Sequence, residues 1–175
     1  MARDRTFLYQ AEQQNLLGEA IIELFTINLA TAIGGAGKSP VYFCNWEETN
    51  GTFVQFAGEQ YAPIPYQASG FAISNEGVLP NPQITISNVA LLPTSLANNY
   101  KDLLGTQIIR TQVLAKHLDQ GSDPDINAKW PDETWFVQRK VTENKLFITW
   151  ELSTPFDLDG VTIPKRRARF IANPI

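Results

Sequence analysis

FAGEQYAPIPYQASGF, residues 56–71, sets glycines and prolines between aromatic residues at short intervals, so the chain must change direction repeatedly here. Just before it, Thr52–Phe56 has the alternation of an extended strand. Ala57 and Gly58 then supply a tight turn that leads into Tyr61, a pattern that predicts a β-hairpin. The stretch therefore favours a turn-rich β protein over a helical one.

Further stretches on both sides have the composition or the period of β-strands. They are Ala20–Leu29, Val41–Trp46, Gln83–Val89, Gln107–Leu118, and the pair Trp135–Val141 and Leu146–Leu152, which we expect to form a hairpin around Glu143 and Asn144. Two short helices are predicted as well. One lies near the N-terminus and ends at Gly18, and the other lies near 95–104, capped by Thr94 or Ser95 and closed by Gly105. The pattern predicts a mainly β (α+β) fold, an antiparallel barrel or sandwich with helical additions.

Composition limits the classes of function. The chain has 175 residues, 43% of them hydrophobic and 18% charged, which fits one folding unit or two small subdomains with a shared core. Low charge suits a protein whose surface is covered by partners. The net charge of −4 argues against a dedicated nucleic-acid binder. Because no apolar run approaches the roughly 20 residues of a membrane helix and no signal peptide is evident, we expect a soluble protein made inside a cell.

A glycine-rich loop between two predicted strands resembles part of a phosphate-binding loop. It runs Gly34-Gly35-Ala36-Gly37-Lys38-Ser39, but Ala32 stands where that motif needs its first glycine. Pro40 and a β-rich run follow, instead of the helix whose N-terminus would bind the phosphates. We therefore interpret it as a mobile loop.

Metal and thiol chemistry have few candidates. Asp119, Gly121, Asp123 and Asp125 have the alternation of a calcium loop, but a proline interrupts it and Trp130 stands where the closing carboxylate belongs. The sequence contains one cysteine, Cys44, and one histidine, His117, too few for a zinc site without an unusual set of carboxylates. We interpret the aspartates as a solvated turn, the cysteine as a small buried hydrophobe and the histidine as a strand-end residue.

Charged residues suggest two further kinds of site, a hydrolytic active site and an interface between subunits. The carboxylates available for acid–base hydrolysis are Glu47, Glu48, Asp132, Glu133 and Glu151, most of them beside turns. The concentrated basic run comprises Lys165, Arg166, Arg167 and Arg169. It follows Ile163-Pro164, and we interpret it as a charged strand edge or an inter-subunit ion-pair strip, with phosphate contact as the alternative.

The segment Phe56–Pro65 with Ser69–Phe71 resembles the same segment of the minor tail protein L family of lambda-like tailed phages. The likeness continues in order through Val41–Asn45, Ile84–Asn88, Leu104-Gly105, Leu118-Asp119, Ser153–Pro155, Asp159-Gly160 and Ala172-Asn173. It covers most of the chain from Val41 onward. Colinear matches across that length are specific, although no single piece is.

The resemblance implies a virion component at the tail tip. It implies a hub protein at the distal end of the tail tube, in a ring of three, that joins the tube-proximal proteins to the host-recognition apparatus. The chain would form one tail-hub domain over 1–175, or two closely packed β subdomains, with a barrel-like antiparallel core. Its partners would be other tail proteins and copies of itself, it would assemble in the host cytoplasm, and it would not be an enzyme.

Family members continue into a small domain with four cysteines that resembles an iron–sulfur site. This sequence stops at Ile175, so we expect either a naturally short relative or a chain whose remainder is missing. Cys44 alone cannot replace four thiolates, and no cofactor is expected here. Two other functions stay open. One is a tube-proximal distal tail adaptor with sixfold placement, and the other is a cell-wall hydrolase that uses Glu151, His117 and Asp132.

Overall fold

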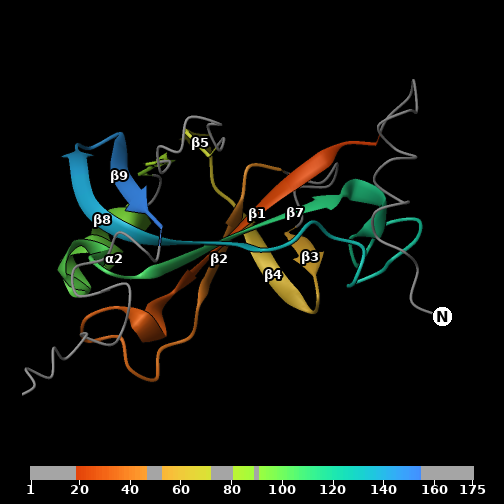
Figure 1. The fold of residues 1–175 in the computed structure, drawn as a ribbon, viewed down its shortest axis with the longest axis horizontal. Helices are drawn as coiled ribbons and strands as arrows, with labels where there is room; N and C mark the ends of the chain where they lie inside the picture. Colours follow the sequence, from red (N-terminus) through yellow and green to blue (C-terminus); the bar gives the residue numbers. More distant parts are fainter. Residues whose placement is uncertain (1–18, 47–52, 72–80, 89–90, 155–175) are drawn as a thin grey trace, which may run out of the picture.

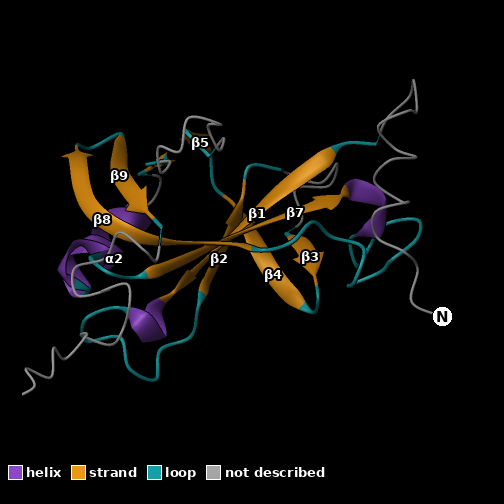
Figure 2. Ribbon diagram, viewed as in Figure 1, coloured by secondary structure: helices purple, strands orange, loops and turns teal. Residues whose placement is uncertain are grey.

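The computed structural model describes residues 19–46, 53–71, 81–88 and 91–154, and these form one mainly β assembly (Figures 1 and 2). The strands are β1 Ile21–Asn28, β2 Val41–Cys44, β3 Val54–Phe56, β4 Glu59–Pro63, β5 Tyr66–Ser69, β6 Gln83–Ser87, β7 Gln107–Leu114, β8 Glu133–Glu143 and β9 Phe147–Ser153. One α-helix, α2, spans Leu92–Asn99. Short 3-10 turns cover Leu29–Thr31, Lys101–Leu103 and Ala115–His117.

The strands form one nine-stranded sheet in the order β3-β4-β2-β1-β7-β8-β9-β6-β5. All neighbours are antiparallel except β2 and β4, which run parallel, with Phe43 opposite Ala62. The two ends of this order, β3 and β5, are not paired with each other. The sheet is therefore mixed and open, and the predicted antiparallel, barrel-like closure is not confirmed.

The central strand β1 is buried on both faces, which explains its nearly continuous apolar sequence. Phe25 and Ile27 point into a large core that also receives Ile84, Trp135 and Trp150. Ile22 and Leu24, on the other face of β1, point into a second core, which we call the hairpin core because the β3–β4 hairpin packs there. Its other members are Cys44, Val54, Phe56, Tyr61, Val113 and Leu118. The hairpin and α2 lie toward opposite ends of the molecule (Figure 1).

The predicted hairpin in the opening segment is confirmed. Ala57 and Gly58 both have positive φ, 58° and 79°, as a two-residue turn between twisted strands requires. The aromatics that follow point inward. Tyr61 is 6% exposed, and the ring centroids of Tyr66 and Phe25 lie 4.9 Å apart. Gly70, with φ of +82°, ends β5 and turns Phe71 back against Trp135, with ring centroids 5.4 Å apart.

The predicted helix near 95–104 is confirmed as an element but not in its bounds. It begins at Leu92, with Pro93 in its first turn, and Leu91 rather than Thr94 or Ser95 is the N-cap residue. Beyond Tyr100 the chain breaks into a 3-10 turn in which Lys101, Asp102 and Leu103 all have positive φ. The predicted N-terminal helix lies outside the described residues.

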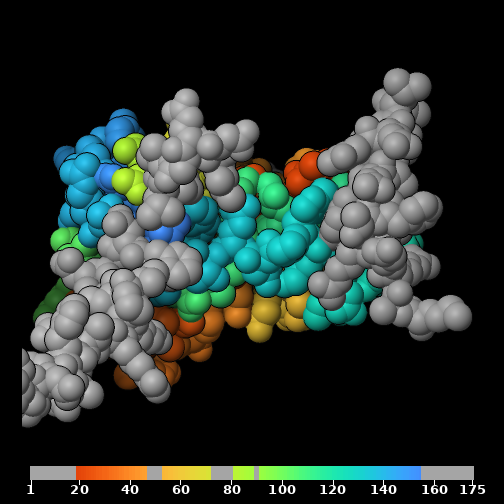
Figure 3. Space-filling view, in the orientation of Figure 1, coloured from red at the N-terminus to blue at the C-terminus, as the bar shows by residue number. Residues whose placement is uncertain are grey.

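The ends of the strands also differ from the predictions. The strand predicted to reach Leu118 ends at Leu114, because residues 115–117 turn into a 3-10 helix. The last hairpin is longer than predicted at its first strand, β8, which extends to Glu143. In the space-filling view this hairpin, blue, lies at one end of the described part, and the loop after β7, teal, lies at the other (Figure 3).

Candidate interaction site at the β5 edge

The two edges of the sheet differ in how their backbone groups are satisfied. At β3, the Gln55 carbonyl accepts a hydrogen bond from the Asp119 N–H at 3.0 Å, and the Asp119 carboxylate accepts from the N–H groups of Ala57 and Gly58 at 3.0 and 2.8 Å. At β5, no described strand pairs with the outer edge. An unpaired edge is a template for another chain.

Register shows which β5 groups are unpaired. The Ser87 N–H donates to the Pro65 carbonyl at 2.9 Å, so in an antiparallel ladder Gln67 and Ser69 are the next residues that exchange hydrogen bonds with β6. The backbone N–H and C=O groups of Tyr66 and Ala68 therefore point away from β6. They face outward at the β5 edge.

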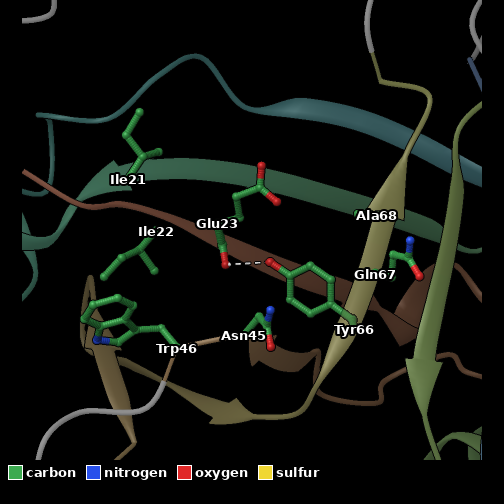
Figure 4. Close-up of a pocket in the computed structure, with 8 residues that line it drawn as sticks. All are labelled: Ile21, Ile22, Glu23, Asn45, Trp46, Tyr66, Gln67 and Ala68. Atoms are coloured by element: carbon green, nitrogen blue, oxygen red, sulfur yellow. Dashed lines mark hydrogen bonds between the residues drawn. The ribbon is translucent and has the colours of Figure 1, made fainter. Parts of the chain in front are cut away.

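A cleft of about 360 Å³ lies beside this edge, between β5, the start of β1 and the end of β2 (Figure 4). The residues that line it are Ile21, Ile22, Glu23, Asn45, Trp46, Tyr66, Gln67 and Ala68. The Tyr66 hydroxyl crosses it and donates to the backbone carbonyl of Glu23 at 3.3 Å. Burial raises the pKa of Tyr66, so the phenol remains a protonated donor at ordinary pH.

Glu23, which lines the cleft, belongs to a group of three charged side chains. Arg110, on β7, pairs with Glu23 and, at 3.0 Å, with Glu133 of β8. Its guanidinium carbon lies 4.6 Å from the centre of the Phe71 ring, a cation–π contact. Burial acts to lower the pKa of Arg110, but the hydrogen bonds to the two carboxylates outweigh it and raise that pKa. One guanidinium facing two carboxylates leaves about one unit of negative charge at this site.

A second hollow, a groove of about 500 Å³, flanks β5 on the opposite side. Its residues are Pro65, Tyr66, Gln67, Thr85, Ser87, Leu146 and Phe147. Leu146 is 76% exposed and Phe147 36%, which is high for large apolar side chains that adjoin each other. The β5 edge thus lies between a polar cleft and an apolar-rimmed groove.

The glycine-rich loop and the calcium-like loop both have structural surroundings. Ser39 leads into β2 rather than a helix, so no helix N-terminus follows the glycines. Asp119 binds the β3–β4 turn through both carboxylate oxygens. Among the described residues, no cluster of three or more His, Cys, Asp or Glu side chains has metal-binding geometry.

Cys44 and His117 are each held by a backbone carbonyl. The Cys44 thiol, fully buried, lies 3.3 Å from the Trp46 carbonyl oxygen, and burial raises its pKa, which disfavours the reactive thiolate. His117 is 2% exposed, and its Nδ1 lies 2.8 Å from the Asp123 carbonyl oxygen. These contacts agree with the structural interpretations of both residues.

The two candidate catalytic carboxylates, Asp132 and Glu151, have different hydrogen-bond partners and lie apart. Asp132 accepts from Thr111 at 2.7 Å and Lys129 at 2.6 Å, and Glu151 accepts from Arg139 at 2.7 Å. Glu151 is opposite Arg139, which lies seven positions beyond Asp132, so the backbone positions of the two acidic residues are separated by about 20 Å along the strand direction. They do not form an acid–base pair. Glu47, Glu48 and the basic run Lys165, Arg166, Arg167 and Arg169 lie outside the described residues.

Known proteins resemble this chain over most of its length. The family model described as phage minor tail protein L matches residues 31–173. The chain belongs to that family. It is also 30% identical over 152 residues to the protein named tail tip protein L of Escherichia phage lambda, an alignment that covers 84% of this chain and 64% of the relative. This minor tail protein thus spans just under two thirds of the length of that curated relative.

Membership of the family makes the chain a structural tail protein of a lambda-like phage. In the part of the tail protein that the structure describes, no helix has the length and apolarity needed to cross a bilayer. The cleft and the charged group that includes Glu23 were not predicted from the sequence. The available signal was Glu23 and Arg110, two opposite charges that are each the single charged residue of a strand, a pattern that favours an ion pair.

Proposed function

We propose that this tail protein is a tail-tip (baseplate hub) component, located at the tip of the virion tail, that connects the distal tail tube to the host-recognition apparatus. The observation that carries the proposal is the 30% identity to lambda tail tip protein L across 84% of the chain. The unpaired β5 edge and the exposed Leu146 and Phe147 support it, because they are surfaces that suit assembly.

The proposed partners are other tail proteins and copies of itself in a ring of three, assembled in the host cytoplasm. A ring needs heterologous contacts, so surfaces on opposite sides of each copy should be buried. The basic run Lys165, Arg166, Arg167 and Arg169 would supply ion pairs between subunits. No cofactor, catalysis or specific nucleic acid is part of this function.

A reconstruction of purified tails tests the proposal. We expect density for this chain at the tail tip with threefold placement. Sixfold placement next to the tube would instead support the distal tail adaptor, and absence from the particle would contradict both. For the hydrolase alternative, loss of peptidoglycan cleavage on substitution of Glu151, His117 and Asp132, with assembly intact, would change the class of function.

A further inference from the structure

We propose that the β5 edge is a strand-docking site, at which an extended segment of a different tail polypeptide adds a tenth strand to the sheet beside Tyr66–Ser69. The inference rests on the proposed role as a tail-assembly component. It adds which backbone atoms make the contact and which kind of segment fits.

The unpaired backbone groups carry the first step. Tyr66 and Ala68 each present an N–H and a C=O at one edge, with the spacing of an antiparallel ladder. An extended segment that pairs with them gains main-chain hydrogen bonds, the source of affinity in strand addition. The opposite edge of the sheet offers no comparable site, because the Asp119 N–H already occupies the Gln55 carbonyl of β3.

The two hollows carry the second step. Successive side chains of a strand point to opposite faces, so a strand added to β5 directs alternate side chains into the cleft and into the groove. The cleft and the groove have volumes of about 360 and 500 Å³ and both are lined by Tyr66 and Gln67, so they flank the same short edge. Hollows on both faces are what alternate side chains of an added strand require.

Charge indicates the chemistry of the segment. Glu23 is the charged residue among those that line the cleft, and it shares Arg110 with Glu133, which leaves excess negative charge. Trp46, 41% exposed, supplies an aromatic face at the same cleft. A lysine or arginine of the segment would interact favourably with both the negative charge and the aromatic face.

A second copy of this chain fits less well. In the described residues its other sheet edge, β3, has three residues, and Asp119 covers it. The occupant we infer is therefore another polypeptide of the tail.

Hydrogen–deuterium exchange of the full chain, free and within purified tails, tests the inference. In the free chain we expect rapid exchange of the Tyr66 and Ala68 amides, and in tails a slowing of about tenfold or more in the peptide that contains them. The peptide of β3, already covered, should change little. No slowing in tails would overturn the inference, and so would slow exchange in the free dilute chain, because the edge would then be covered from within.

Slow exchange that appears in the purified chain only at high concentration would identify a second copy as the occupant and overturn the choice of partner. Absence of the chain from tails would instead contradict the proposed function. The two failures are therefore distinguishable.

A matched pair of variants tests strand pairing itself. Ala68→Pro removes one of the two N–H groups that face the edge without removing a bond to β6, and Ala68→Ser keeps that N–H. With both variants folded, as judged by circular dichroism, we expect Ala68→Pro to lose incorporation into tails and Ala68→Ser to retain it. Equal incorporation would overturn strand pairing. If Ala68→Pro does not fold, the exchange experiment on the unmodified chain still decides.

Discussion

At the scale of single residues, polar side chains act here mainly as substitutes for missing backbone partners. The Asp119 carboxylate accepts hydrogen bonds from two N–H groups of the β3–β4 turn. The Tyr66 hydroxyl donates to the Glu23 carbonyl, in the first part of β1, which has no partner on the β2 side. The sequence pattern placed Asp119 in a solvated loop and could not reveal its target, because Ala57 and Gly58 lie some sixty positions earlier. Contacts at that separation depend on tertiary structure.

Substitution Asp119→Ala should weaken the β3–β4 turn. It removes both charge-assisted hydrogen bonds to a turn in which Ala57 holds a positive φ, so we expect the free energy of unfolding to fall by about 1–2 kcal/mol. Urea unfolding followed by circular dichroism measures it. Asp119→Asn, which keeps one acceptor oxygen, should lose less. An unchanged midpoint for Asp119→Ala would show that the turn forms without it.

Substitution Tyr66→Phe should change stability in a pH-dependent manner. At neutral pH we expect a loss of about 1 kcal/mol, since the Glu23 carbonyl loses its donor. Because burial raises the folded pKa of Tyr66 above its unfolded value near 10, the unmodified chain loses stability as pH rises above about 10.

The Tyr66→Phe chain lacks that ionisation, so its stability should fall less steeply between about pH 10 and 11 than that of the unmodified chain. Urea midpoints across this range provide the comparison. The slope should not vanish, because burial also raises the pKa of Tyr61 and Cys44. Parallel curves for the two chains would contradict a buried Tyr66 phenol.

At the scale of elements, periodicity predicted what local patterns determine and missed what distant contacts determine. The strands at β1, β2, β6 and β9 and the Ala57-Gly58 turn follow from β-forming composition, alternation and turn chemistry. The helix start was misplaced because Thr94, the predicted cap, is bonded instead to Asn88 at 2.9 Å. The edge at β5 depends on the order of strands in the sheet, which no window of sequence encodes.

Asn88 joins three elements and should be sensitive to substitution. It is 6% exposed, and its side-chain amide donates to Thr94 of α2 and to the Asn144 carbonyl in the β8–β9 turn at 2.9 and 3.2 Å. We expect Asn88→Ala to lower the free energy of unfolding by about 2 kcal/mol, because the hydrogen bonds that a buried side-chain amide makes to two other elements are lost. Asn99→Ala, at an exposed residue bonded to Ser95, is the matched control and should stay within about 0.5 kcal/mol.

At the scale of the whole molecule, β1 couples two cores. Its side chains alternate between them, and its neighbour β7 does the same, with Ile108 in one core and Val113 in the other. Loss of either core therefore exposes one face of both central strands. The fold has no described boundary at which one core could unfold and leave the other intact.

We therefore expect a single cooperative unfolding transition, and Val54→Ala tests it. Val54 is fully buried in the hairpin core, so its truncation to alanine should lower the free energy of unfolding by about 2 kcal/mol. Although Trp135 and Trp150 lie in the other core, tryptophan fluorescence and far-UV circular dichroism should report the same lowered midpoint. Ile84→Val, in the core that contains Trp135 and Trp150, is the reciprocal variant. It should lower the free energy of unfolding by about 1 kcal/mol, and both signals should report the same shift. Separate midpoints for the two signals would instead indicate two subdomains that unfold independently.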